Sequence, residues 1–178
     1  HNGIDTEAFH PIPSVQRIPD RIMVTASADA PLKGLEYLIR AMPDLIARHP
    51  KLHLLIVGRL KEDGATSKLI EQLGIRSRLT IVSGIDTDQL VRYYAEASLV
   101  VVPSVYEGFG LPAGEAMACG VPVVSTDGGA LPEVVGDAAI QVPTRNSMAL
   151  GEAIHRLLED PEQRLAMGRA GRDRIGAR

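Results

Sequence analysis

The chain has 178 residues, of which 45% are apolar and 23% are charged, as in ordinary soluble globular domains. Lys and Arg total 19 against 22 Asp and Glu, so no broad basic surface is available for nucleic acid or anionic lipid, and any phosphate recognition must be local. The single cysteine, Cys119, excludes an internal disulfide and fits a reducing compartment. No apolar run reaches the ~18 residues of a membrane span, and we expect a cytoplasmic protein.

Short runs of β-branched and apolar residues recur along the chain, each followed by a segment with helical periodicity. The expected strands are residues 21–27, 52–58, 79–84, 98–104, 121–126 and 138–143. This alternation is typical of βαβ units, whose helices cover both faces of a parallel sheet. The sequence therefore predicts one α/β domain over residues 1–178, a Rossmann-like three-layer sandwich around a mostly parallel six-stranded sheet.

The expected helices carry apolar stripes and recognisable start signals. An apolar face in the first crossover comprises Leu35, Leu38, Ile39, Met42, Leu45 and Ile46. Asp86 is expected to cap a later helix together with Gln89 in a capping box. Asn146 and Asp160 are expected to cap two helices near the end of the chain, the second of which begins with Pro161.

Residues that follow the strands are the candidates for a binding site, because ligands of an open parallel sheet lie beyond the carboxyl ends of its strands. In chain order these residues are Lys33, Gly58, Arg59, Gly84, Ile85, the loop within "EGFGLPAGE" (107–115) and "DGGALPE" (127–133). Glycines and polar side chains thus gather at one edge of the predicted sheet.

The segment "EGFGLPAGE" combines an anion site with two carboxylates. Gly108, Phe109 and Gly110 form a loop that enters a helix near Pro112, where free backbone N–H groups and the helix dipole favour a phosphate. Glutamates at 107 and 115 would repel that phosphate unless they face hydroxyl donors on either side of it. Ribose hydroxyls, a diphosphate and sugar hydroxyls follow one another in this order in a nucleotide sugar.

Residues 107–136, "EGFGLPAGEAMACGVPVVSTDGGALPEVVG", resemble the E-x7-E signature region of the retaining glycosyltransferases called group 1, which have the two-domain GT-B fold. The similarity runs from "NGID" to the final "LLEDPE" helix pair but covers only the C-terminal, donor-binding half. The start of the chain also reads as that of an excised piece. We therefore expect an absent amino-terminal half that holds the acceptor site and any membrane contact, and we expect this chain alone to be inactive.

The resemblance also implies roles for individual residues. Glu115 should bind the ribose, Glu107 the transferred sugar, and Lys33 the diphosphate. Further donor contacts should come from the backbone of Gly108, Phe109, Gly110 and Leu111 at the phosphate and sugar, and from the region of Gly84 and Ile85 at the base. The chemistry implied is transfer of a sugar from a nucleoside diphosphate with its anomeric configuration kept, without a metal or another cofactor.

One residue departs from the family pattern. The family usually has an Arg five residues before the Lys, where this chain has Ala28, and alanine cannot make the phosphate contact expected of that Arg. Arg59, and the adjacent Gly58, follow the second strand, and Arg59 is a candidate to replace that contact.

Other interpretations of the same residues remain open. Glu115 could be a partner of the helix dipole in the first turn, and the 127–133 segment could be turn and cap chemistry alone. The five histidines show no H-x-x-x-H or similar spacing, so we predict no metal site. "GFGLPAG" also resembles the glycine fingerprint of nicotinamide-dependent oxidoreductases, although it follows the fourth predicted strand rather than the first. A non-catalytic nucleotide-binding module is the third alternative.

Overall fold

A parallel β-sheet forms the middle layer of the computed structural model, which describes residues 3–26 and 30–177. The six strands are β1 (Arg21–Ala26), β2 (His53–Gly58), β3 (Leu79–Val82), β4 (Leu99–Val102), β5 (Val123–Thr126) and β6 (Ile140–Val142). Their order in the sheet is β3-β2-β1-β4-β5-β6, and each neighbouring pair in the described residues is parallel. The predicted α/β class and the six strands are confirmed.

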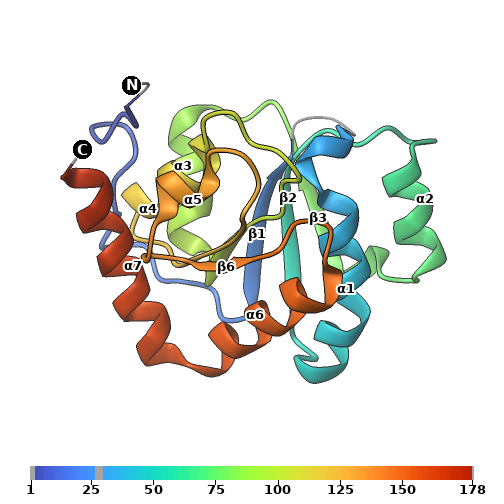
Figure 1. The fold of residues 1–178 in the computed structure, drawn as a ribbon. Coiled ribbons are helices and arrows are strands. Elements are labelled where there is room, and N and C mark those ends of the chain that lie inside the picture. Colours follow the sequence, from blue (N-terminus) through green and yellow to red (C-terminus); the bar gives the residue numbers. More distant parts are fainter. Residues whose placement is uncertain (1–2, 27–29, 178) are drawn as a thin grey trace.

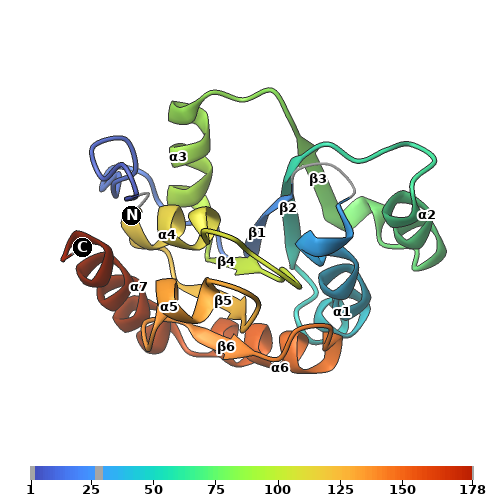
Figure 2. The same ribbon diagram turned by 45° about the horizontal axis from the view of Figure 1, so that its top comes forward.

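Helices cover both faces of this sheet (Figures 1 and 2). They are α1 (Leu35–Arg48), α2 (Ala65–Gln72), α3 (Thr87–Glu96), α4 (Leu111–Ala118), α5 (Leu131–Val135), α6 (Ser147–Glu159) and α7 (Pro161–Gly176), with short 3-10 turns η1 (Pro31–Lys33) and η2 (Arg76–Arg78). The α1, α2 and α6 helices pack on one face, and α3, α4, α5 and α7 contribute to the core on the other. Among the described residues, none of the helices combines the length and apolarity needed to cross a membrane.

Alternate side chains of each strand enter two separate cores. In β1, Ile22 and Val24 pack toward α1 and α6, whereas Met23 packs toward α3 and α4, as the two-residue period of a strand requires. Burial on both faces explains why the strands read as unbroken apolar runs. Cys119 belongs to the second core, where burial raises the pKa of its thiol to about 12.

Local hydrogen-bonding chemistry sets the ends of the elements. The β4 strand ends before Pro103, which has no N–H to donate to a neighbour. The N–H of Val121 closes the end of α4 by donating to the carbonyl of Ala116 at 2.9 Å. The β4 strand is therefore shorter than the predicted 98–104, and β5, which begins after this turn at Val123, is shorter than the predicted 121–126.

The predicted helix caps are confirmed. The N–H of Gln89 donates to the carboxylate of Asp86 at 2.8 Å, and the amide oxygen of Gln89 accepts from the N–H of Asp86 at 3.3 Å. Asn146 and Asp160 cap α6 and α7 in the same manner.

The strand order changes direction between β1 and β4. From this pair the chain proceeds to α1 on one face and to α4 on the other, so the carboxyl ends of the two strands form the switch point of the sheet, where ligands of such sheets bind. That edge lies at the top of Figure 1 and is turned toward the viewer in Figure 2.

We predict that Asp86→Ala lowers the melting temperature by about 2–4 °C, because it removes a cap worth about 1 kcal/mol. Asp86→Asn keeps the acceptor oxygen and is the matched control. Thermal unfolding of both variants is the measurement. Equal losses for Ala and Asn would contradict the capping explanation.

Candidate functional site

The loops that follow β1 and β4 are hydrogen-bonded to each other at this switch point. The backbone N–H groups of Val105 and Tyr106 both donate to the carbonyl of Leu32, at 2.8 and 3.3 Å. Gly34 has φ +65°, and a Cβ there would lie 2.0 Å from the carbonyl oxygen of Pro103. Only glycine permits this close contact, so the "LKG" sequence brings the two loops together.

Lys33 and Glu107, the two predicted catalytic residues, form an ion pair across this junction. The Lys33 Nζ lies 2.9 Å from Glu107 Oε2, and Ser104 Oγ donates to the same oxygen at 3.2 Å. Glu107 is only 8% exposed, and a buried carboxylate requires such partners. A lysine and a glutamate, 74 positions apart, thus neutralise each other where the sequence predicted both to act.

Two glycines after β5 support the loop that carries Glu107. A Cβ on Gly129, which has φ +62°, would lie 2.3 Å from the Glu107 carbonyl oxygen, and one on Gly128 would lie 2.6 Å from that of Val105. The N–H of Ala130 donates to the Glu107 carbonyl at 2.8 Å. The "DGG" segment, whose role the sequence left open, therefore packs directly against the site.

The glycine-rich loop leads into α4 through two exposed residues and a buried N-cap glycine. Gly110 is the N-cap residue, with φ +68°, and it has no side chain with which to bond the first N–H groups of the helix. Gly108 is exposed and Phe109 is 64% exposed. Since the first N–H groups of a helix lack intrahelical partners, the start of α4 at Leu111 can bind an anion.

Glu115 is held by a residue that the sequence did not single out. The hydroxyl of Tyr94, a fully buried residue of α3, donates to Glu115 Oε2 at 2.9 Å. Desolvation raises the pKa of Glu115, although the bond from Tyr94 opposes this shift. Burial, followed by the charge of Glu115, raises the pKa of Tyr94. Tyr94 lies 21 positions before its partner, so spacing offered no signal for this pair.

The position of Glu115 in α4 excludes the helix-dipole interpretation. Glu115 is the fifth residue of the helix, and the first turn holds no acidic residue. Because the dipole acts mainly within the first turn, it does not explain a carboxylate at this depth.

The remaining candidates lie at the same edge of the sheet, at the ends of other strands. Gly58 has φ +151°, and a Cβ there would lie 1.6 Å from the carbonyl oxygen of Ala26. Arg59 is exposed directly after β2, and Gly84 and the half-buried Ile85 follow β3. Ala28 lies outside the described residues.

A pocket of about 370 Å³ opens between α1 and α2, beside the loop that follows β1. Among its lining residues are Lys33, Glu36, Arg40, Leu60, Lys68 and Gln72. It shares Lys33 with the junction but does not include the glycine-rich loop. Lys33 therefore borders both this pocket and the junction of the two loops.

Residues 12–174 match the family model described as "Glycosyl transferases group 1". The MMP alpha-(1->4)-mannosyltransferase of Mycolicibacterium hassiacum is 41% identical over 97% of this chain and 42% of that protein. The GDP-mannose-dependent alpha-(1-6)-phosphatidylinositol monomannoside mannosyltransferase of Mycolicibacterium smegmatis is 34% identical over 96% of this chain and 49% of that protein. The chain thus spans less than half the length of either relative.

A solved structure shares the fold over nearly the whole length of both chains. It is the C-terminal domain of a group 1 glycosyltransferase from Francisella tularensis, with a TM-score of 0.87 and 24% identity, and the match covers 99% of this chain and 98% of that one. The Rossmann-like architecture is therefore that of the C-terminal domain of GT-B glycosyltransferases.

We predict that Glu115→Gln raises the melting temperature at pH 7. Because the pKa of Glu115 in the folded state lies above its ordinary value of 4.5, the folded state binds more protons than the unfolded state between the two values, and stability falls as the pH rises through that window. Glutamine removes this loss and still accepts from Tyr94.

The measurement is thermal unfolding at pH 4 and pH 7, with exposed Glu62→Gln as the control. The gain should be smaller at pH 4, where the carboxyl of the unfolded chain is already largely protonated. A loss of stability at pH 7, or an equal gain at both pH values, would contradict the assignment.

Proposed function

The chain belongs to the group 1 glycosyltransferases, and we propose that it is the domain of such an enzyme that binds the nucleotide-sugar donor. The observation that carries this proposal is the ion pair of Lys33 and Glu107 beside the start of α4. It brings a cation, a carboxylate and available backbone N–H groups together at the switch point of a parallel sheet, where ligands of such sheets bind.

The diphosphate is proposed to bind between Lys33 and the first N–H groups of α4. Its charge competes with Glu107 for the lysine, whose Nζ lies 2.9 Å from the carboxylate before the ligand arrives. Lysine offers three donors, so it can contact a phosphate oxygen while keeping the carboxylate. As the bond to the sugar breaks, these fixed donors stabilise the charge that develops on the departing diphosphate.

Glu107 is proposed to accept hydrogen bonds from the transferred sugar. Its burial and its bonds from Lys33 and Ser104 hold the carboxylate in place. In a retaining transfer, positive charge builds on the sugar ring, and a fixed carboxylate close to the ring stabilises that charge more strongly in the transition state than in the bound donor.

Glu115 is proposed to bind the ribose hydroxyls, with Tyr94 as a positioning residue. The hydroxyl of Tyr94 occupies one oxygen of the carboxylate, which leaves the other oxygen to accept from the ribose. The backbone at Gly84 and Ile85, after β3, is proposed to contact the base.

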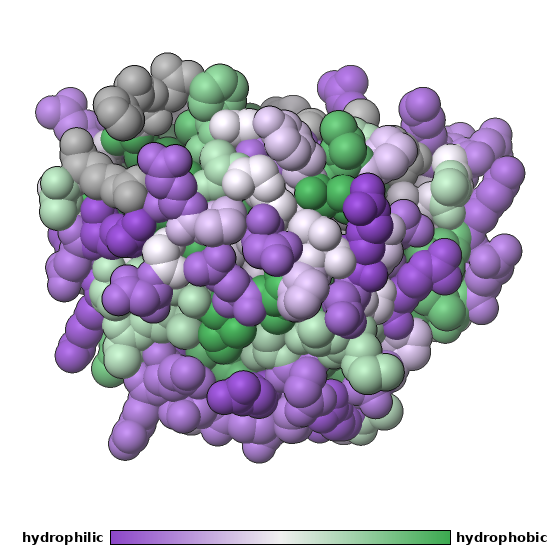
Figure 3. All heavy atoms as spheres, viewed as in Figure 1, coloured by the Kyte–Doolittle hydropathy of each residue, from purple (hydrophilic) through white to green (hydrophobic). Residues whose placement is uncertain are grey.

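Exposed apolar side chains around the ion pair support a facing domain. Four of these side chains are largely exposed: Leu32 (55%), Tyr106 (59%), Phe109 (64%) and Leu111 (40%). In Figure 3 the upper edge mixes apolar and weakly polar atoms with hydrophilic ones, whereas the lower margin is mostly hydrophilic. Such apolar exposure is typical of a surface that another part of a protein covers. The proposed cover is the amino-terminal half, with the acceptor site, so the chain alone is expected to transfer no sugar.

The names of the relatives support the donor class. The Mycolicibacterium smegmatis relative is GDP-mannose-dependent, and both relatives are mannosyltransferases. A nicotinamide-dependent oxidoreductase fits less well, because the glycine-rich loop follows β4 and not β1.

We predict that the chain binds a nucleoside diphosphate without a divalent metal, because the proposed phosphate contacts are Lys33 and backbone N–H groups. Calorimetry with UDP, GDP, ADP and TDP in EDTA is the measurement. Affinity should be modest, because contacts and closure from a facing domain are missing. The proposal fails if none of the four binds at millimolar concentration, or if binding requires added magnesium.

Lys33→Ala should weaken binding of the preferred diphosphate roughly 10- to 150-fold and leave the nucleoside almost unaffected, since a charge-assisted contact contributes about 1.5–3 kcal/mol.

Glu107→Gln should barely change diphosphate binding but should remove the extra affinity of the nucleotide sugar. Calorimetry with each variant and each ligand provides the comparison.

Lys68→Ala is the matched control for Lys33→Ala, because it removes an exposed lysine from the pocket between α1 and α2. It should bind the diphosphate as the wild type does. Equal losses for Lys33→Ala and Lys68→Ala would place the phosphate in that pocket and contradict the assignment to the junction. Equal losses for diphosphate and nucleoside would show that Lys33 does not meet phosphate.

A further inference from the structure

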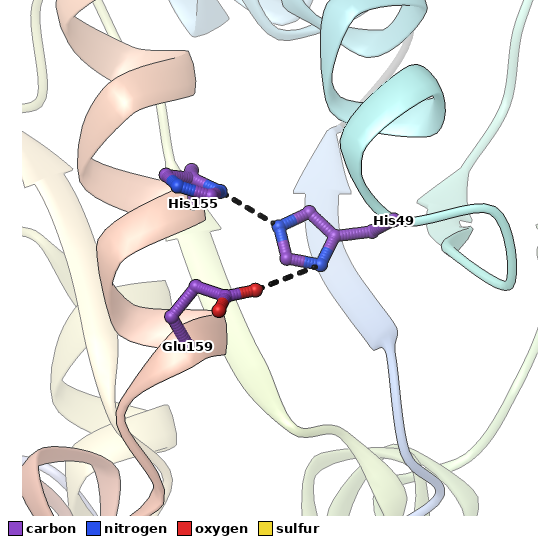
Figure 4. A group of neighbouring side chains, drawn as sticks. All are labelled: His49, His155 and Glu159. Carbon is purple, nitrogen blue, oxygen red and sulfur yellow. Dashed lines mark hydrogen bonds and ion pairs between the residues drawn. The ribbon is translucent and has the colours of Figure 1, made fainter.

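Two histidines and a glutamate from distant parts of the chain meet between α1 and α6 (Figure 4). His49 is the residue that ends α1, and His155 and Glu159 lie on α6. Because residues four apart share one face of a helix, His155 and Glu159 both point toward His49. Each of the three offers one ligand atom, and these atoms lie within 4.8 Å of one another.

The imidazole of His49 lies between the other two side chains. Its Nε2 is 2.9 Å from Nδ1 of His155, and its Nδ1 is 3.7 Å from Glu159 Oε1. His49 is 8% exposed, whereas the side chain of Glu159 is 62% exposed. The cluster is thus protein-enclosed on the His49 side and open to solvent on the Glu159 side.

We propose that His49, His155 and Glu159 form a binding site for one zinc ion that joins α1 to α6. Two imidazole nitrogens and a carboxylate oxygen are a donor set that zinc prefers, and a water can supply the fourth ligand on the open side. The ion replaces the hydrogen bond between the two facing nitrogens, and each imidazole binds it in the neutral form through one nitrogen.

The metal requires a small separation of the two imidazoles and a larger movement of Glu159, which faces the other nitrogen of His49. With Zn–N distances of ~2.0–2.1 Å and a tetrahedral angle, two ligand nitrogens lie ~3.4 Å apart, and the facing nitrogens of His49 and His155 are 2.9 Å apart. The carboxylate of Glu159, at the end of an exposed side chain, can rotate toward the ion. An adjacent ion pair between Arg48 and Glu152, at 3.0 Å, already holds the two helices at this separation.

The site is separate from the proposed donor site. Lys33 precedes α1 and His49 follows it, and a helix of 14 residues separates its ends by about 20 Å. The zinc ion is therefore a structural link at the amino edge of the sheet and takes no part in donor binding. The spacing of the histidines did not indicate this site, because His49 lies 106 positions from His155 and the third ligand is a glutamate.

Zinc titration of the 178-residue chain by calorimetry, together with thermal unfolding, tests the site. One zinc ion per chain should bind, and at a concentration about a hundredfold above the dissociation constant the melting temperature should rise by about 5–10 °C. The exposed His10 provides the matched control: His10→Ala should bind zinc as the wild type does, whereas His155→Ala and Glu159→Gln should each lose at least about tenfold in affinity.

Unfolding curves recorded in EDTA show whether each variant folds, and the exposed Glu159→Gln change keeps the test valid if His155→Ala does not fold. Diphosphate binding by Glu159→Gln in EDTA should match the wild type, so failure of the donor proposal and failure of the zinc site are distinguishable. No saturable binding of zinc, or equal affinities for Glu159→Gln and His10→Ala, would overturn the proposal.

Discussion

The ion pair between Lys33 and Glu107 is the interaction on which the site depends. A carboxylate next to a phosphate site is repulsive unless a cation shares its charge, and at 2.9 Å Lys33 is that cation. The pair exists because the strand order brings β1 beside β4, and because Gly34, Gly128 and Gly129 allow three backbone segments to approach where a side chain would collide. Fold topology and glycine placement thus create a local charge arrangement on a chain whose net charge is slightly negative.

Different interactions stabilise the two glutamates of "EGFGLPAGE". Glu107 is buried beside a cation and a hydroxyl, which supply the hydrogen bonds that a buried carboxylate requires. Desolvation raises the pKa of Glu115, and the hydrogen bond from the hydroxyl of Tyr94 opposes this shift. Carboxylates with raised pKa values are concentrated at functional sites. This supports the inclusion of the half-buried Glu115 in the proposed donor site.

The sequence predicted those features of the fold that depend on residues close together in the chain. The strands, the capping box at Asp86 and the gathering of loops at one sheet edge all follow from local periodicity and from the geometry of parallel sheets. Contacts between distant positions were not predictable in this way. The bond from Tyr94 to Glu115, the packing of Gly129 under Glu107 and the cluster around His49 each require the three-dimensional fold to bring separate elements together. Strand ends were predicted too long, because apolar residues continue past the point where Pro103 ends the backbone pairing of β4.

The proposed function requires a nucleoside diphosphate to bind at the junction of the loops after β1 and β4. Backbone amide shifts in ¹H–¹⁵N spectra, recorded during titration with the diphosphate that binds, test this most directly. The largest shifts are expected at Gly108, Gly110 and Leu111, with smaller ones at Gly84. Shifts confined to Leu60, Lys68 and Gln72, in the pocket between α1 and α2, would contradict it.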